Sequence, residues 1–183
     1  MILRTARVLG VHPETLLDVG AGIGILHHEL LAAGVATAVH VEAAQAYVDA
    51  ARTEAGRRGQ LERVRFLHGD FLALASTLEP ADLVTLDRVV CCYPELEPLV
   101  RESVAKARRG YAISYPLDRW YVRVHTAWQN SRRRRAGNPF RTFVHPPGRI
   151  RALLREGGLR VAEVRRTLVW EVVFALRDGP IAG

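Results

Sequence analysis

The sequence predicts a doubly wound α/β domain with a mostly parallel sheet and helices on both of its faces. Short apolar runs typical of strands alternate with helical patterns between residues 15 and 116. Such alternation gives parallel strands joined by right-handed crossovers, which place helices on both faces. Two further strand-like runs lie within residues 159–178, and we expect them to be antiparallel. No internal repeat or long linker divides the 183 residues, so one domain is predicted.

Five strands are predicted in the first part of the chain. The first is TLLDVG, and it leads to the helix ILHHELLAAG, where apolar residues from Ile23 through Leu26 and Leu30 to Ala33 follow helical spacing. Gly34 is a natural end for this helix. The other strands are ATAVHVE, RVRFLHGDF, ADLVTLD and YAISYP, and the longer helices between them are AAQAYVDAARTEAGRRG and PELEPLVRESVAKARRG.

The pattern changes after Pro116. The segment LDRWYVRVHTAWQNSRRRRAG predicts a helix that has Trp120, Val124, Ala127 and Ser131 on one face. NPFRTFVHPPG is predicted to be a loop or an extended piece, and GRIRALLREGG predicts another short helix. The two closing strands come from LRVAEVRRTLVWEVVFALRD.

The composition is that of a globular protein with a strongly basic balance. The formal net charge is +7, and nearly all of the positive charge is arginine, with Lys106 as the one lysine. A composition bias of the source genome explains this better than a nucleic-acid partner or an acidic substrate. No run reaches the roughly 20 apolar residues of a membrane span, and the N-terminus lacks a signal-peptide pattern. The only cysteines, Cys91 and Cys92, are adjacent, so we expect a cytoplasmic protein without membrane partners.

A glycine-rich loop follows the first predicted strand, at residues 19–24. In open parallel sheets, ligands bind at the carboxyl ends of strands, so this loop is expected to hold a nucleotide. A dinucleotide fingerprint would place a further glycine where this chain has Ile25, and a phosphate-binding loop would end in Gly-Lys-Ser/Thr. The glycines taken alone fit a plain turn as well as a cofactor loop.

Four carboxylates stand at the ends of successive predicted strands, namely Asp18, Glu42, Asp70 and Asp87. Glu42 can accept hydrogen bonds from both hydroxyls of a ribose. Asp70 can accept one from an adenine amino group while Phe71 packs on the ring. Each acid taken singly fits a helix cap or a loop, but together they would repel a pyrophosphate and attract a cation. The predicted cofactor is therefore the sulfonium nucleoside S-adenosylmethionine (SAM).

These blocks resemble the successive motifs of class I SAM-dependent methyltransferases. The resemblance is carried by LLDVGAGIGILHHELLAAG, Glu42, RVRFLHGDF and ADLVTLDRVVCCYPEL. The last block, with AISYPLDRW and NPFRTFVHPP, is similar to a bacterial subgroup of small-molecule methyltransferases distantly similar to Mg-protoporphyrin O-methyltransferases. The resemblance covers nearly the whole chain. It implies a Rossmann-like, seven-stranded sheet whose last, C-terminal strand is antiparallel.

The same resemblance implies where SAM would bind. Glu42 would hold the ribose, and Asp70 with Phe71 would hold the adenine. Asp87 and Arg88 would form the floor beneath the sulfonium. The methionine side would be lined by Asp18, Gly20, Ala21, Gly22 and Gly24. No metal is expected.

Enzymes of this class commonly carry a helical arm that covers the active site. Here 15 residues precede Leu16, which is enough for one short helix, ILRTARVLG. The predicted domain, residues 1–183, therefore has a shortened N-terminal cap. We expect either that the chain begins downstream of its natural start, or that the site is open or closed by another subunit, so a homo-oligomer is one of the alternatives.

The methyl acceptor is expected beside the ends of the fourth and fifth strands. Methyl transfer depends mostly on alignment of the partners, so no catalytic triad is required. His145 is the candidate general base, and Tyr93 is the other candidate catalytic residue. Of His27 and His28, one is expected to face solvent and the other to approach the site. Further candidates for substrate contact are Tyr115, Trp120 and Arg123.

Two motifs raise more specialised chemistry. The Cys91–Cys92 pair lacks the Pro-Cys of RNA cytosine methylation and the additional thiols of arsenic methylation. Packing at the start of a helix is the favoured interpretation of this pair. The basic run SRRRRAG fits a solvated helix end first, an acidic substrate second and an RNA backbone third.

The predicted function is SAM-dependent methyl transfer to a small molecule, with oxygen as the favoured acceptor atom. Two alternatives stay open. One is a SAM-binding protein that lacks turnover, either a lidless remnant or a partner subunit. The other is an RNA methyltransferase, for which a nucleic-acid partner is less favoured than a small molecule.

Overall fold

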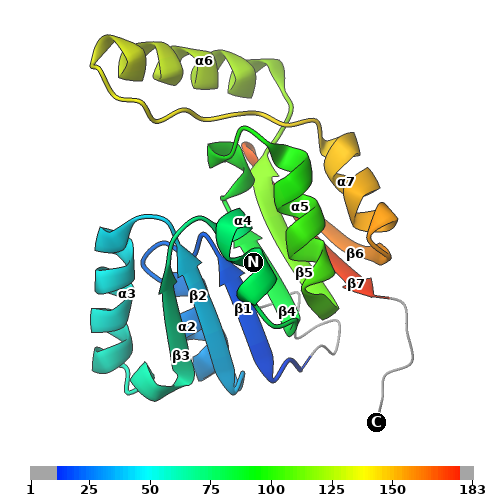
Figure 1. The fold of residues 1–183 in the computed structure, drawn as a ribbon. Coiled ribbons are helices and arrows are strands. Elements are labelled where there is room, and N and C mark those ends of the chain that lie inside the picture. The colour runs from blue at the N-terminus through cyan, green and yellow to red at the C-terminus, as the bar shows by residue number, and fades with distance from the viewer. Residues whose placement is uncertain (1–11, 178–183) are drawn as a thin grey trace.

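The computed structural model describes residues 12–177 and confirms the predicted fold class (Figure 1). Its seven-stranded sheet has the order β3-β2-β1-β4-β5-β7-β6. The pairs among β1 to β5 are parallel, whereas β7 is antiparallel to both of its neighbours, β5 and β6. The last strand in the sequence is therefore the antiparallel one, as predicted. The expected N-terminal helix and shortened cap lie outside the described residues.

The strands and helices follow the predicted order. The strands are β1 (Thr15–Val19), β2 (Thr37–Glu42), β3 (Val64–His68), β4 (Ala81–Asp87), β5 (Ala107–Pro116), β6 (Leu159–Arg166) and β7 (Trp170–Arg177). The α-helices are α2 (Ile25–Ala32), α3 (Gln45–Arg57), α4 (Phe71–Leu74), α5 (Leu96–Ala105), α6 (Trp120–Arg135) and α7 (Pro147–Glu156). Short 3₁₀ turns are η1 (Leu61–Arg63), η2 (Ala75–Thr77) and η3 (Val90–Cys92). None of the helices within residues 12–177 is both long and apolar enough to cross a bilayer.

The core lies on both faces of the sheet. Successive side chains of a strand point to opposite faces, so neighbouring residues of β1 enter different hydrophobic clusters. Leu16 belongs to the cluster that includes Leu30 of α2, while Leu17 belongs to the cluster that includes Leu99 of α5. Helices α4 and α5 accordingly cover one face and α2 the other (Figure 1). Burial on both faces explains why these strands are continuous apolar runs in the sequence.

Helix α2 buries only part of the face that its apolar spacing predicts: Leu30 is buried and Leu26 packs against the core. Ile23 lies before the helix and is exposed, whereas His27 and His28 are both fully buried. The expectation that one of these histidines faces solvent is therefore wrong. His27 Nδ1 donates to Asp18 Oδ2 at 3.2 Å, and His28 Nδ1 donates to Gln60 Oε1 at 2.8 Å. These buried polar partners make the burial of both rings tolerable.

His40 of β2 completes a cluster of three buried imidazoles. The ring centroid of His27 lies 4.3 Å from that of His28 and 5.1 Å from that of His40. Both ring nitrogens of His40 lack a hydrogen-bond partner among the described residues. Burial, with a smaller effect of the neighbouring His27, lowers the pKa of His40 to about 4. Burial also lowers the pKa of His28, so these two rings are neutral at pH 7.

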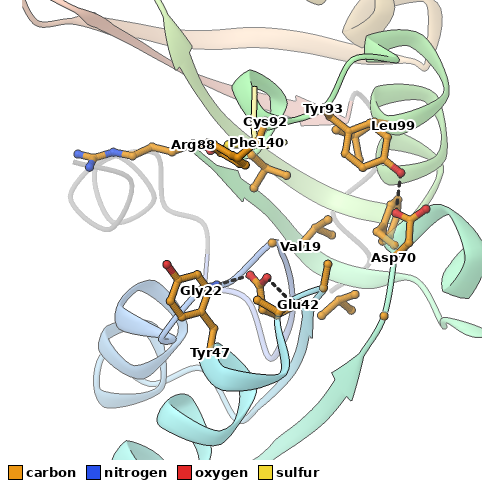
Figure 2. Close-up of a pocket in the computed structure, with 17 residues that line it drawn as sticks. Val19, Gly22, Glu42, Tyr47, Asp70, Arg88, Cys92, Tyr93, Leu99 and Phe140 are labelled. Atoms are coloured by element: carbon orange, nitrogen blue, oxygen red, sulfur yellow. Dashed lines mark hydrogen bonds between the residues drawn. The ribbon is translucent and has the colours of Figure 1, made fainter. Parts of the chain in front are cut away.

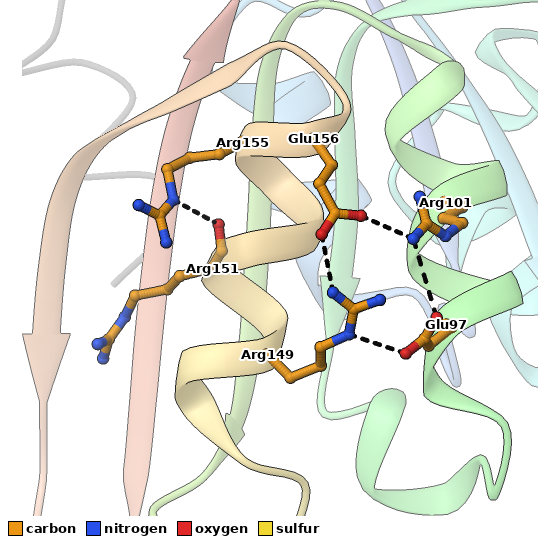
Figure 3. A network of polar contacts seen from close by, with 6 residues as sticks. All are labelled: Glu97, Arg101, Arg149, Arg151, Arg155 and Glu156. Carbon is orange, nitrogen blue, oxygen red and sulfur yellow. Dashed lines mark hydrogen bonds and ion pairs between the residues drawn. The ribbon is translucent and has the colours of Figure 1, made fainter.

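Helices α5 and α7 lie side by side and are joined by four charged side chains (Figure 3). Arg101 Nη2 donates to Glu156 Oε2 at 2.6 Å. Arg149 donates to both Glu97 and Glu156, in each case at 2.8 Å. Exposed pairs of this kind contribute about 0–1 kcal/mol each. Their structural effect is to hold the start of α7, where the preceding segment ends, against α5.

Helix α6 stands apart from the sheet (Figure 1). Of its 16 residues only Val122 is buried, and Trp120 is 77% exposed. The face predicted from Trp120 and Val124 is therefore open to solvent and does not pack on the body of the protein. Little apolar burial holds this helix in place.

Candidate functional site

A cavity of about 730 Å³ opens where the parallel strands end (Figure 2). The glycine loop after β1, the end of β2, the turn between β3 and α4, and the segment after β4 all contribute to its wall. The structure brings together a majority of the predicted site residues on this wall. They are Gly20, Gly22, Glu42, Asp70, Phe71, Arg88 and Tyr93.

Glu42 anchors the glycine loop and faces the cavity (Figure 2). Its Oε2 accepts a hydrogen bond from the Gly22 amide and its Oε1 accepts one from the Ala44 amide, both at 2.9 Å. The amides of Gly20 and Ala21 donate to the carbonyl of Val41 at 2.8 and 3.2 Å. The loop thus folds over the end of β2. One carboxylate both shapes this loop and presents negative charge to the cavity.

The three glycines of the loop have positive φ angles of 62°, 56° and 83°, but they serve different purposes. A Cβ atom at Gly20 would lie 2.6 Å from Val89, and one at Gly24 would lie 2.4 Å from His27. A Cβ atom at Gly22 would meet nothing within 4 Å. Gly20 and Gly24 are therefore required by packing. Gly22 is the position where bare backbone borders open space that a ligand can fill.

We expect Gly24→Ala to lower the free energy of unfolding by about 2–5 kcal/mol. A left-handed conformation costs a residue with a Cβ about 1–2 kcal/mol, and overpacking against His27 adds about 1–3 kcal/mol. Gly22→Ala is the matched control, because it incurs only the first of these costs. Urea unfolding measures both variants, and equal losses of stability would contradict the packing role of Gly24.

Asp70 lies opposite Glu42 in the cavity and caps α4 (Figure 2). Its Oδ1 accepts from the Leu72 amide at 3.4 Å and from the Tyr93 hydroxyl at 2.5 Å. Burial and the Asp70 carboxylate raise the pKa of Tyr93 above its ordinary value, so the phenol stays protonated. Phe71, next in sequence, is buried in the core and also lines the cavity.

Neither Asp18 nor Asp87 lines this cavity: Asp18 is directed into the protein, whereas Asp87 is exposed and lines a smaller hollow that it shares with Arg88. Asp18 is buried, and its Oδ1 accepts from Thr85 Oγ1 at 2.6 Å while its Oδ2 pairs with His27. Asp87 accepts a hydrogen bond from Ser114 Oγ. Asp18 therefore serves internal hydrogen bonds, while Asp87 stays accessible beside Arg88, and the ligand contacts expected of both stay predictions. Ala21 and Gly24 also lie outside the cavity wall.

Arg88 has an unusual backbone and a side chain that leaves the cavity. Its φ angle of 61° is the one left-handed conformation of a non-glycine residue in the described part of the chain. Its amide donates to Ser114 Oγ at 2.8 Å. The guanidinium lies 5.0 Å from the ring centroid of Trp170 and extends away from Glu42 (Figure 2). Arg88 thus contributes to the cavity wall without directing its charge at Glu42.

His145 lies outside the cavity and is used to position the chain. Its Nε2 lies 2.9 Å from the carbonyl oxygens of both Val90 and Tyr93. Because both partners are acceptors, Nε2 carries the proton. The amide of Phe143 donates to the carbonyl of Cys91 at 2.7 Å, so this segment is tied to η3. His145 is not brought to the cavity wall, and its role as general base stays a prediction.

The other candidates for substrate contact are not brought to the cavity. Tyr115 is buried, and its hydroxyl donates to Glu171 Oε1 at 2.5 Å. Trp120 and Arg123 belong to α6 and do not line the wall.

Among the lining side chains that the sequence did not indicate, Tyr47, Cys92 and Phe140 are the ones that offer an aromatic ring or a thiol. Tyr47 stands in the first turn of α3, directly after the strand that ends at Glu42, and that position was a usable signal. Cys92 was expected only to pack. A hydrogen bond with the Cys91 thiol, and secondarily the charge of Arg133, lowers its pKa to about 7.

The residues on the wall suit a ligand with a positive charge and a sugar or base. Glu42 and Asp70 offer carboxylate acceptors, Tyr47 and Phe71 offer aromatic surface, and Gly22 offers bare backbone. Within residues 12–177 no three histidine, cysteine or acidic side chains are grouped so that they could hold a metal ion.

Comparisons with known proteins agree with this arrangement. A family model described as a methyltransferase domain matches residues 17–113. No curated protein matches the sequence. A solved structure of magnesium protoporphyrin IX methyltransferase from Synechocystis with bound S-adenosylhomocysteine (SAH) has a TM-score of 0.77 and 20% identity, over 97% of this chain and 80% of that one.

Two other solved structures illustrate the range of similar folds. An O-methyltransferase family protein from Burkholderia thailandensis has a TM-score of 0.75 and 18% identity, over 97% of this chain and 57% of that one. Human N-acetylserotonin methyltransferase in complex with SAM has a TM-score of 0.65 and 17% identity, over 91% of this chain and 48% of that one. At these identities the similarity shows a shared fold.

Proposed function

Because the chain belongs to the family of methyltransferase domains, we propose that it transfers a methyl group from SAM to a small-molecule acceptor, at an oxygen atom. One observation carries this proposal. The Glu42 carboxylate faces a cavity at the strand ends, beside the bare backbone of Gly22. Structural neighbours that contain SAM or SAH support the same choice of cofactor.

The residues of the cavity fit this cofactor. Glu42 would accept hydrogen bonds from the ribose hydroxyls, and Asp70 with Phe71 would hold the adenine. The two carboxylates also favour a ligand of positive charge. When bound, SAM supplies a methyl group that is activated by its positively charged sulfur.

The contribution of this chain is orientation, without an obvious general base. His145 does not line the cavity, and Tyr93 is held protonated. Aligning two reactants is worth up to about 7–11 kcal/mol, which is sufficient when the acceptor needs no deprotonation. The site therefore suits an acceptor oxygen that arrives as an anion.

Calorimetric titration with SAH tests the cofactor assignment. We expect saturable binding, and SAH at 100 times its Kd should raise the free energy of unfolding by about 2.7 kcal/mol. For a chain of this size that is roughly 5–11 °C in Tm. NAD is the control, since the carboxylates disfavour its pyrophosphate. No heat and no shift in Tm at millimolar SAH would contradict the proposal.

A further inference from the structure

We propose that the methyl acceptor is an aromatic carboxylate, bound at the C-terminal end of α6 by Arg133 and Arg132 beside Phe140 and Trp128. This inference rests on the function proposed above and specifies the class of its substrate. It combines three observations: a group of arginines without carboxylate partners, a guanidinium held beside a wall residue of the cavity, and an aromatic hollow next to it.

The arginines at the end of α6 differ from those on the body of the protein. On the body, Arg58 pairs with Glu54, and Arg149 pairs with Glu97. The four arginines at residues 132–135 form no ion pair with any carboxylate in the described part of the chain. The helix dipole favours cations at this end, but it neutralises only about half a charge. Positive charge is therefore left over for an anionic partner.

Arg133 is held in a defined position by uncharged groups. Its Nη1 donates to Thr142 Oγ1 at 3.1 Å and to Asn130 Oδ1 at 3.3 Å. Its guanidinium lies 5.0 Å from the ring centroid of Phe140, which lines the cavity. The charge of Arg133 also contributes to the lowered pKa of Cys92, another wall residue. A preorganised cation thus lies beside Phe140, which is a wall residue of the cofactor cavity.

A second hollow of about 620 Å³ adjoins this cation. Its lining includes Trp128, Gln129, Arg132, Arg133 and Arg135. The guanidinium of Arg132 lies 4.9 Å from the ring centroid of Trp128, and that ring is 53% exposed. Exposed aromatic rings offer stacking surface, and guanidinium groups bind carboxylates through paired hydrogen bonds. Together they match a planar molecule that carries an acid group.

The distribution of charge separates the two ligands. Glu42 and Asp70 present negative charge on the cavity wall, whereas Arg133 presents positive charge beside Phe140. A cationic cofactor fits the acidic part, and the basic part would disfavour a second cation. A carboxylate oxygen is already anionic at neutral pH, so it needs no base. This agrees with a cavity wall that includes no histidine among the described residues.

The experiment measures binding of three naphthalene probes to the SAH-saturated protein by calorimetry. We expect 1-naphthoate to bind at least about tenfold more tightly than neutral 1-naphthamide, since hydrogen bonds to a charged group are worth about 1.5–3 kcal/mol. 1-Naphthyl phosphate should bind more weakly than 1-naphthoate. Arg133→Gln should weaken 1-naphthoate by about tenfold. Arg134→Gln makes the same change of charge outside the hollow. It should weaken the binding of 1-naphthoate by less than about twofold.

Several results would overturn this inference. Equal affinities for the acid and the amide, or equal losses in Arg133→Gln and Arg134→Gln, would remove the specific carboxylate site. Tighter binding of the phosphate would reassign the hollow to phosphoryl compounds. Steeply salt-dependent binding of single-stranded RNA that falls equally in both variants would assign the arginines to nucleic acid. SAH affinity, measured in the same variants, should be unchanged; loss of SAH binding in the unmodified protein would instead contradict the proposed function.

Discussion

Replacing Glu42 with alanine is expected to lower the affinity for SAH by about 100-fold or more. The carboxylate accepts hydrogen bonds from the amides of Gly22 and Ala44 and faces the cavity. Hydrogen bonds to a charged group contribute about 1.5–3 kcal/mol each, so the loss of a charged ligand contact and of the loop anchor together reaches this size. Calorimetric titration with SAH gives the affinity directly.

Two controls separate binding from folding in this experiment. Glu42→Gln keeps one carbonyl acceptor, so its affinity for SAH should fall by about tenfold, which is less than the fall in the alanine variant. Glu62→Ala removes an exposed carboxylate of η1 and should bind SAH as the unmodified protein does. Urea unfolding of each variant shows whether the fold is retained. Unchanged SAH affinity in a folded Glu42→Ala protein would rule out Glu42 as a cofactor ligand.

Acidification is expected to destabilise the protein through its buried histidines. The pKa of His40 is about 4 in the folded protein and near 6.5 when unfolded, so only the unfolded chain takes up a proton between these values. The stability from His40 is fully present above pH 6.5 and is lost as the pH falls toward 4. The loss amounts to about 1.4 kcal/mol per pH unit and about 3 kcal/mol by pH 4. His28, whose pKa is also lowered, adds to it.

Urea unfolding at several pH values between 7 and 4.5 measures this loss. The matched variant is His40→Phe, which keeps an aromatic ring in the cluster and removes the titrating group. Its stability should depend less steeply on pH than that of the unmodified protein, whatever its stability at pH 7. Parallel pH profiles for the two proteins would show that His40 is not responsible.

The sequence was sufficient to predict the sheet, because strands that are buried on both faces appear in the sequence as continuous apolar runs. The positions of Glu42 and Asp70 also followed from the sequence, since the ends of parallel strands meet at one edge. The burial of His28 could not be predicted in this way. It depends on Gln60, which lies 32 residues away, and local spacing contains no information about such a partner.

The surroundings of the acceptor were equally beyond local reasoning. Phe140 reaches the cavity from a segment that follows α6, and no spacing rule fixes where such a segment crosses the sheet. His145 fits a general base by type and position in the sequence. Only the three-dimensional structure shows that it lies off the cavity wall, where its Nε2–H is bonded to the carbonyls of Val90 and Tyr93. Roles that depend on contacts distant in sequence therefore require coordinates.

The position of α6 has a consequence for how chains of this kind can diversify. The residues proposed to recognise the acceptor come from one contiguous stretch between Pro116 and Pro146, in which only Leu117 and Val122 are buried apolar residues. Apart from Phe140, the lining of the cofactor cavity comes from residues 19–99. A single recombination event that replaces this stretch would therefore change the substrate range and leave the sheet and most of the cofactor cavity as they are. Grafting it between paralogues would be a direct route to engineered selectivity.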